Sequence, residues 1–156
     1  MTASQTAAEA SAALRIESVT DATVADWRLV HNQVIPTAPL SEPDVRERLG
    51  RHLLTVAHAG TVLVGCATVR RPDEAGTATV IARVLPEHRR RGLGEAIYLH
   101  SMRVARNLGP ASIETVVLAS NHDGVRFALT HGFAEVGRDL PPGAVDAFIT
   151  LRLHRQ

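Results

Sequence analysis

Residues 85–97, with the sequence LPEHRRRGLGEAI, combine residue types that bind anions. Three arginines at 89–91 run directly into Gly92 and Gly94, and a helical pattern follows at once. The first amides of a helix have no carbonyl partners and carry partial positive charge, so they attract an anion. Glycine lets the backbone close around an oxygen atom, and arginine adds charged, forked donors. The segment therefore predicts a phosphate or pyrophosphate site.

Two common nucleotide-binding loops do not fit this segment. A Walker loop requires a lysine, and the chain has none, because all 17 of its Lys and Arg residues are arginine. The same absence excludes catalysis through a lysine Schiff base. A Rossmann loop requires a third glycine within a parallel strand–helix–strand unit, and that glycine is missing. The alternative interpretation is a solvated arginine patch whose glycines serve only the turn, but basic residues at a helix start are unfavourable without an anion.

The elements that would position this loop follow from the spacing of apolar residues. Apolar runs predict strands at 14–19, 53–59, 62–70, 77–85, 112–119, 134–139 and 146–153. Helical spacing predicts helices at 23–32, 41–49, 94–108 and 122–131. Thr23 with Asp26, and Ser41 with Asp44, have the spacing of capping boxes at the first two helix starts. The run at 112–119 is of the type buried on both faces of a sheet.

The order of these elements predicts an α+β fold in which strands and helices are mixed along the chain. Short connections make the three strands between 53 and 85 antiparallel neighbours, and a helical crossover joins the last of them to 112–119. A length of 156 residues suits one compact domain. We expect residues 1–13 to be a mobile tail and residues 14–156 to form that single domain.

Composition and charge narrow the class of protein. Apolar residues make up 45% and charged residues 21% of the chain, and the formal net charge is +1. These values are typical of a globular protein and give no bulk attraction to nucleic acid or to a membrane. No apolar stretch approaches the roughly 18 residues of a membrane span, and the N-terminal residues lack the pattern of a secretory signal. We therefore expect a cytoplasmic protein.

Cysteine and histidine usage argues against a disulfide and a metal site. Cys66 is the only cysteine and lies in the apolar run VLVGCATV, where we expect it to be buried. The 8 histidines show no metal-binding spacing. We expect no metal cofactor.

The loop and its flanking elements resemble the GNAT superfamily of acyl-coenzyme A-dependent N-acyltransferases. Members carry Q/R-x-x-G-x-G/A between a strand and a helix, usually preceded by V-x-P, and VLPEHRRRGLG at 84–94 matches this signature. The segment VVLASNHDGVRFALTHGF at 116–133 is similar to the family segment that closes the coenzyme site. The resemblance covers residues 14–153 and implies a mostly antiparallel central sheet of about six to seven strands flanked by about four helices.

The same resemblance implies acetyl-CoA as co-substrate and a location for its pantetheine arm. Backbone groups of Val84 and Leu85 would hold that arm like an added strand. A splay of the sheet between 77–85 and 112–119 would admit it.

Further contacts to the coenzyme are implied on either side of the arm. The pyrophosphate would be bound, mainly through backbone amides, by Arg89, Arg90, Arg91, Gly92, Leu93, Gly94 and Glu95. Asn121 would hydrogen-bond the pantetheine, and Gly124 would allow the coenzyme to approach closely. Arg126 either reaches toward the adenosine phosphate or is simply solvated.

For the chemistry, the resemblance implies direct attack of an amine on the thioester in a ternary complex, with a backbone amide near Val84 or Leu85 as the oxyanion donor. Many members have a tyrosine acid four residues before the glycine of the G-F pair, but Ala128 occupies this position. We expect the only tyrosine, Tyr98, to be a packing residue. Water or Ser120 would then supply the proton to the leaving thiolate.

The general base and the acceptor stay open. Three residues are candidates for the base by chain position alone: His31, His122 and Asp123. Arg83 cannot act as a base, but it could bind an acidic acceptor or make a cross-strand contact. The family places its acceptor pocket among the first helices, the strand before the loop and the final strand connection, which implicates 31–41 and 140–145.

Three functional hypotheses follow. The leading one is an N-acetyltransferase for a small-molecule or peptide amine, with a homodimer as a possible assembly and neither nucleic acid nor membrane as a partner. The second is a non-catalytic acyl-CoA-binding sensor or interaction module on the same fold, motivated by the missing tyrosine. The third, a toxin-like enzyme that acylates charged transfer RNA, is disfavoured by the net charge of +1.

Overall fold

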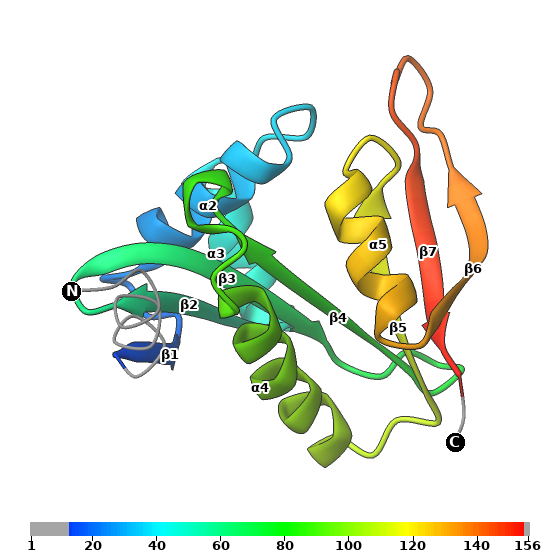
Figure 1. The fold of residues 1–156 in the computed structure, drawn as a ribbon, viewed down its shortest axis with the longest axis horizontal. Helices are drawn as coiled ribbons and strands as arrows, with labels where there is room; N and C mark the ends of the chain where they lie inside the picture. Colours follow the sequence, from blue (N-terminus) through cyan, green and yellow to red (C-terminus); the bar gives the residue numbers. More distant parts are fainter. Residues whose placement is uncertain (1–12, 155–156) are drawn as a thin grey trace.

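The computed structural model describes residues 13–154 of the chain. Its elements are β1 (Leu14–Ser18), α2 (Val24–Val34), α3 (Glu42–Arg51), β2 (Leu53–Ala59), β3 (Val62–Arg70), β4 (Thr77–Val84), the 3₁₀ turn η1 (Pro86–His88), α4 (Leu93–Asn107), β5 (Ser112–Leu118), α5 (His122–Thr130), β6 (Phe133–Asp139) and β7 (Phe148–Leu153). A 7-stranded sheet has the order β1-β2-β3-β4-β5-β7-β6 (Figure 1). Its neighbours are antiparallel except β4 and β5, which are parallel. The expected mixed, mostly antiparallel α+β fold is confirmed, whereas the expected tail lies, apart from Ala13, outside the described residues.

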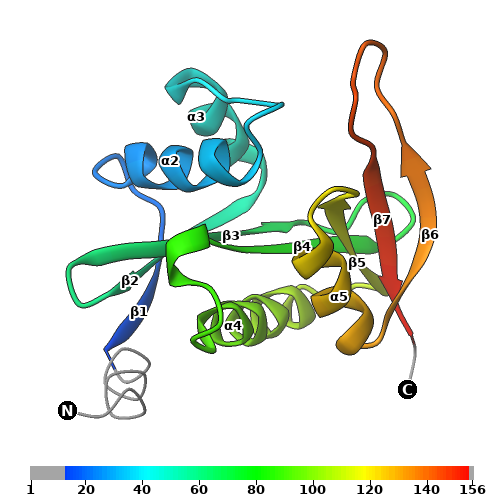
Figure 2. The ribbon, with the colours of Figure 1, turned by 45° about the horizontal axis from the view of Figure 1, so that its top comes forward.

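Helices cover both faces of the sheet. Figures 1 and 2 show α2 and α3 on one face of the β1–β4 half and α4 on the opposite face. Helix α5 lies on the same side as α4, and the two helices meet through the rings of Tyr98 and Phe127. Strands β3 and β4 are therefore enclosed between helices, and they are accordingly rich in buried residues. Within residues 13–154, no helix is both long and apolar enough to cross a bilayer.

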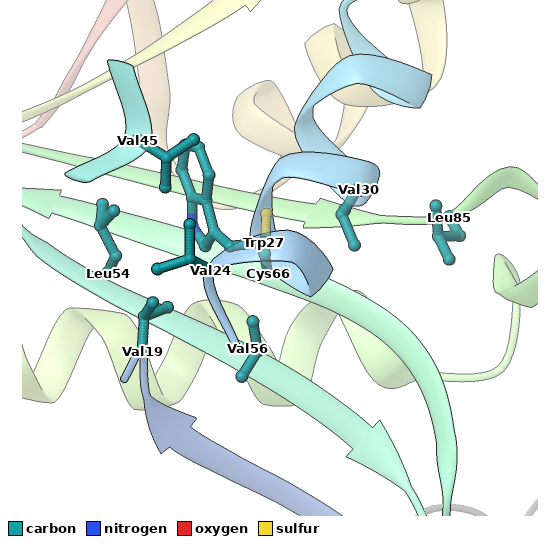
Figure 3. Packing of buried hydrophobic residues seen from close by; sticks show 9 residues of the cluster. All are labelled: Val19, Val24, Trp27, Val30, Val45, Leu54, Val56, Cys66 and Leu85. Atoms are coloured by element: carbon teal, nitrogen blue, oxygen red, sulfur yellow. The ribbon is translucent and has the colours of Figure 1, made fainter. Parts of the chain in front are cut away.

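The face beneath α2 is filled by apolar side chains (Figure 3). The cluster consists of Val19, Val24, Trp27, Val30, Val45, Leu54, Val56, Cys66 and Leu85. Val24, Trp27 and Val30 share one face of α2 by their helical spacing, and all three are buried. The indole Nε1 of Trp27 donates to the Ala67 carbonyl at 3.2 Å, so burial of the ring leaves its donor paired. This packing fixes the position of the rest of α2.

The two predicted capping boxes have different outcomes. At α3, the Ser41 hydroxyl accepts from the Asp44 amide and the Asp44 carboxylate accepts from the Ser41 amide, so that box is confirmed. At α2, the predicted box between Thr23 and Asp26 is wrong. The Thr23 hydroxyl bonds instead to the backbone N–H and carbonyl of Thr20, a local turn that competes with the cap.

The sheet opens between β4 and β5. These strands pair only between Thr77–Thr79 and Ser112–Glu114 and then separate, which confirms the expected splay. The expectation that the whole run at 112–119 is buried on both faces is wrong, because only Ile113 and Leu118 of β5 are buried. Past the split, the edge of β5 that faces β4 borders an opening, while its other edge stays paired with β7. The opening lies next to the loop that precedes α4.

Candidate active site

The loop between β4 and α4 presents a row of unpaired amides. Within the described chain, no acceptor takes a hydrogen bond from the N–H groups of residues 90–95. Helix α4 begins at Leu93, and the amides of its first turn have no partner within the helix. The first bond that closes the turn runs from the Ala96 amide to the Gly92 carbonyl, at 3.3 Å. A run of donors with partial positive charge is therefore available to an anion.

The backbone of this loop is held in an unusual conformation. Arg90 has φ of 64° and Gly92 has φ of 75°, both in the left-handed region. Within residues 13–154, Arg90 is the only non-glycine residue with positive φ. For a residue with a Cβ atom this conformation costs roughly 1–2 kcal/mol, and such strain is concentrated at binding sites. Two left-handed residues so close together turn the backbone sharply just before α4 begins.

Gly92 and Gly94 serve different needs. A Cβ added at Gly92 would meet nothing within 4 Å, so the positive φ alone requires glycine there. Gly94 has no positive φ, and a Cβ added to it would lie 3.5 Å from Val84, an ordinary contact. Leu93, between them, is 1% exposed and anchors the loop in the core. The packing of the protein does not itself require glycine at position 94, and the space over the first turn of α4 is open to a ligand.

The three arginines of the loop are arranged around this row of amides. Arg89 Nε donates to the Val84 carbonyl at 3.1 Å and ties the loop to the end of β4. Arg91 Nη1 lies 3.0 Å from His88 Nδ1. Arg90 is exposed. Arg89 and Arg90 also line the cavity, so two guanidinium groups accompany the unpaired amides there.

The edge of β4 beside the loop is open. The Leu85 amide donates to the Val64 carbonyl of β3 at 2.9 Å. In an antiparallel ladder the backbone groups of the adjacent residue, Val84, then point away from β3. They point into the gap between β4 and β5, because these two strands are no longer paired with each other at this level. The Val84 carbonyl accepts from Arg89, so the Val84 N–H is the donor that faces the gap, whereas the Leu85 N–H is already used.

A cavity of about 960 Å³ passes through this gap. On the loop side it is lined by Arg89, Arg90, Gly92, Gly94, Glu95, Asn121, Gly124 and Arg126. On the side of α2 and α3 it is lined by His31, Ala38, Leu40, Arg48, Arg70 and Arg83. The expected acceptor segment 31–41 thus contributes to the cavity, whereas 140–145 does not line it. The volume is in the range of small-molecule sites.

Three predicted residues lie at the start of α5. Asn121 Oδ1 caps the helix by accepting from the Gly124 amide at 3.1 Å, which leaves Nδ2 to meet a ligand. A Cβ added at Gly124 would lie 2.7 Å from Asn121 Nδ2 and 2.9 Å from Val117 Cγ1, so the packing of α5 against β5 requires this glycine. Arg126 is exposed and lies 3.9 Å from Asp123, a surface contact of little energetic consequence.

The sequence profile of the Acetyltransferase (GNAT) family matches residues 16–133, which include the loop, the split strands and α5. The chain belongs to this family. It is therefore a GNAT acetyltransferase, a class that takes the acetyl group from acetyl-CoA. None of the curated protein sequences matches it significantly.

Solved structures share this GNAT fold at low sequence identity. A proposed phosphinothricin N-acetyltransferase has a TM-score of 0.77 and 19% identity, over 92% of this chain and 99% of its own. The ribosomal-protein-S18-alanine N-acetyltransferase of Escherichia coli has a TM-score of 0.73 and 21% identity, over 90% of this chain and 92% of its own. A GNAT family acetyltransferase of Elizabethkingia anophelis, solved with acetyl-CoA bound, has a TM-score of 0.69 and 15% identity, over 92% and 99% respectively.

The acid expected of a GNAT enzyme is not supplied by the obvious side chains. Ala128, at the position of the tyrosine, is 3% exposed and part of the core. The Tyr98 ring packs edge-on against Phe127 at 5.5 Å between ring centroids, and burial raises the pKa of its hydroxyl. Tyr98 thus has the packing contacts expected from the sequence. The Ser120 hydroxyl already donates to the Asp146 carboxylate, so its proton is engaged.

Of the three candidate bases, His31 and Asp123 line the cavity and His122 does not. His122 and Asp123 are exposed at the start of α5. His31 is 3% exposed on α2, and its Nε2 lies 3.1 Å from the Ala38 carbonyl. Burial, followed by the charge of Arg83, lowers the pKa of His31 to about 4. Among residues 13–154, no group of at least three His, Cys, Asp or Glu side chains is placed to hold a metal ion.

The sequence did not predict that two arginines, Arg48 and Arg70, would line the cavity. Arg83 was recognised on its strand, but Arg48 on α3 and Arg70 at the end of β3 were not. A signal was present for Arg70, because it follows Cys66 at the even spacing that keeps residues on one face of a strand. For Arg48 no local pattern separates an inward-facing arginine from its neighbours on the same helix.

Proposed function

We propose that this GNAT protein is an N-acetyltransferase in which an amine attacks acetyl-CoA directly in a ternary complex. The observation that carries the proposal is the row of unpaired amides at residues 90–95, which opens on the same cavity as the unpaired edge of β4. The first feature suits a pyrophosphate, and the second suits an extended amide-containing arm. The two lie side by side along one cavity, which matches a ligand that contains both groups.

The residues present fit acetyl-CoA. The amides of residues 90–95 and the arginines at 89–91 would hold the pyrophosphate. Asn121 Nδ2 would bind the pantetheine arm within the gap beside Val84, with Leu85 anchoring the end of the strand. Gly94 would allow the phosphate to approach α4. Arg126 remains a rim residue whose contribution would come only through long-range attraction of the adenosine phosphate.

When bound, the coenzyme supplies an activated acetyl thioester. The Val84 N–H, fixed at the open edge of β4, would donate to the thioester carbonyl oxygen as negative charge develops there. The opposite end of the cavity would align the amine, so that positioning supplies most of the rate. The leaving group is a thiolate whose conjugate thiol has a pKa of about 8.5. It therefore departs readily, and a solvent water would supply the proton that it takes up.

Direct attack is favoured over a covalent route through cysteine. Cys66 is fully buried, and burial raises the pKa of its thiol to about 12. A thiol in that state is almost entirely protonated and is a poor nucleophile at neutral pH. An acetyl group transferred to Cys66 would also have to enter the closed cluster around Trp27.

Two measurements test the proposal and separate it from the sensor hypothesis. Calorimetry with acetyl-CoA reports binding alone, and release of free thiol with a panel of amines reports transfer. We expect micromolar or tighter binding and amine-dependent thiol release without a burst of acetylated protein. Binding without thiol release across the panel would favour a sensor. A burst with covalently acetylated protein would contradict direct attack.

A further inference from the structure

Three arginines from three different elements converge on the acceptor end of the cavity. Arg48 comes from α3, Arg70 from the end of β3 and Arg83 from β4, and all three line the cavity. Each is neither fully buried nor fully exposed. This end of the cavity is opposite the loop proposed to bind the pyrophosphate, so the coenzyme loop does not account for it.

The sheet register places two of these arginines on the face below α2 and α3. Arg83 is paired with Cys66, whose side chain lies in the cluster beneath α2. Arg70 follows Cys66 at even spacing on β3 and therefore points to the same face. Because α3 packs over this half of the sheet (Figure 2), Arg48 reaches the same space from above.

These three arginines are half-buried and have no carboxylate partner within the described chain, whereas several of its exposed arginines do have one. Arg46, Arg51 and Arg152 each form an ion pair with a carboxylate. Among residues 13–154, no carboxylate forms an ion pair with any of the three cavity arginines. Half-buried charges are costly when unpaired, so the cavity holds three cations that lack anions.

Burial and the charges of neighbouring arginines lower the pKa values of Arg70 and Arg83. Burial lowers the pKa of Arg83; Cys66 opposes this shift, and the charges of Arg48 and Arg70 add smaller contributions that lower the pKa further. The pKa of Arg70 is lowered by burial and then by Arg48 and Arg51. His31, on the same side, stays neutral because burial and then Arg83 lower its pKa. Each of these shifts would be relieved by a bound anion.

We infer that the acetyl acceptor is a small amine that carries two anionic groups, such as an acidic amino acid or its phosphonate analogue. Three guanidinium groups exceed the charge of one carboxylate, and their forked donors match carboxylate and phosphonate oxygens. Arg83 directly precedes Val84, whose amide faces the gap, so the anion and the reacting amine belong to one small molecule. This inference rests on the proposed acetyltransferase function and specifies its substrate class.

Binding measured without turnover tests the inference separately from the enzyme activity. Calorimetry on the full chain compares L-glutamate with L-glutamine, which has nearly the same size but one anionic group fewer. 2-Amino-4-phosphonobutanoate and L-ornithine complete the panel, so that carboxylate, phosphonate and basic side chains are distinguished. Each titration is run with and without saturating coenzyme A, and acetyl-CoA affinity is recorded independently. We expect the dianionic amines to bind at least about tenfold more tightly than L-glutamine.

Arginine variants identify the origin of this preference. Arg83→Gln and Arg70→Gln should each weaken binding of the preferred dianion by about 10- to 100-fold. Arg46→Gln is the matched control, because Arg46 lies on α3 but pairs with Asp21 outside the cavity. In turnover with the preferred dianion, the variants should raise the KM for the acceptor and leave the KM for acetyl-CoA unchanged.

The outcomes distinguish the two proposals. Loss of acetyl-CoA binding with retained dianion binding would overturn the acetyltransferase proposal and leave the anion site intact. Conversely, neutral or basic amines that bind or react better than the dianions would overturn the inference, as would the absence of dianion binding in a protein that binds acetyl-CoA. An equal effect of Arg46→Gln and Arg83→Gln would also overturn it.

Discussion

At the scale of single residues, the loop before α4 has two glycines for different reasons. Gly92 is required by its positive φ, whereas Gly94 is not required by any contact within the protein. Gly94 lies in the first turn of a helix, where alanine is intrinsically better than glycine by up to about 1 kcal/mol. Only a ligand that approaches the backbone gives glycine an advantage there. The two positions therefore separate a structural requirement from a functional one.

Gly94→Ala should weaken acetyl-CoA binding by about tenfold or more, since a methyl group would occupy the space proposed for the pyrophosphate. The free energy of unfolding should stay constant or rise, because the added Cβ lies at an ordinary contact distance of 3.5 Å from Val84. Calorimetry with acetyl-CoA and denaturant unfolding measure the two quantities.

Gly50→Ala is the matched control for this change. Gly50 lies in α3, and a Cβ added there meets nothing within 4 Å. The control should gain similar stability and bind acetyl-CoA like the wild type. If Gly94→Ala kept full affinity, the pyrophosphate would have to lie away from the first turn of α4.

His31 should make the protein sensitive to mild acid. Its pKa is about 4 in the folded chain, below the ordinary 6.5, because burial disfavours its charged form. Between these values the unfolded chain binds more protons at this site, so the free energy of unfolding falls as the pH drops from 6.5 toward 4. The loss from this group is about 2 kcal/mol. Urea unfolding at several pH values measures it.

His31→Gln is the variant that isolates this effect. Glutamine can still donate to the Ala38 carbonyl, but it does not titrate. Burial also lowers the pKa values of His52 and His100, and these residues keep part of the acid sensitivity in both proteins. The slope of stability against pH should therefore become shallower in the variant without vanishing. Parallel slopes would mean that His31 does not titrate as the structure implies.

At the scale of the elements, the first two helices are started by different means. The N-terminus of α3 has a reciprocal capping box between Ser41 and Asp44. That of α2 relies on packing of Trp27, with the hydroxyl of Thr23 turned back to Thr20. Both sequences have the same cap spacing, so the difference comes from the turn that precedes α2 rather than from the cap residues.

Ser41→Ala should lower the free energy of unfolding by about 1 kcal/mol, because it removes a cap from the helix that carries Arg48. Thr23→Ala should cost less than half of this, since Thr23 makes no side-chain cap. Thermal unfolding of both variants measures the difference. Equal losses would show that the turn at Thr20 stabilises α2 as strongly as a true cap stabilises α3.

How far the sequence predicts the molecule depends on the range of the interactions involved. The loop at 89–95 was predicted because glycine, arginine and a helix start are local signals. The burial of strand β5 was not, because it depends on where β4 and β5 stop pairing. Gly124 lines the cavity, and the close approach of Asn121 and Val117, which also requires glycine there, depends on how α5 packs on β5. Arg48 and Arg70 meet only after the chain has folded, so no local pattern joins them.

At the scale of the whole molecule, the split in the sheet brings two kinds of positive site onto one cavity. The loop before α4 offers backbone amides on one side, and the cavity arginines Arg48, Arg70 and Arg83 offer guanidinium groups on the side of α2 and α3. The gap between β4 and β5 connects them. If β4 and β5 were paired along their whole length, the hydrogen-bonded sheet would separate the loop before α4 from the cavity arginines. The split would therefore allow the proposed coenzyme and the proposed dianionic acceptor to meet at the edge of β4 without sharing a binding surface.

This arrangement predicts a conflict between stability and function at Arg83. Arg83→Met keeps the length of the side chain but removes a half-buried, unpaired charge and its repulsion from Arg48 and Arg70. The free energy of unfolding should rise by about 1 kcal/mol, while binding of a dianionic amine should weaken.

Arg152→Met should act in the opposite direction on stability, because Arg152 donates to Glu114 at 2.6 and 2.9 Å. Denaturant unfolding of both variants in low salt, where charge interactions are least screened, measures the two changes. A charge that serves a substrate lowers the stability of the free protein. A charge that serves the structure raises it. A loss of stability in Arg83→Met equal to that in Arg152→Met would mean that Arg83 is a structural residue.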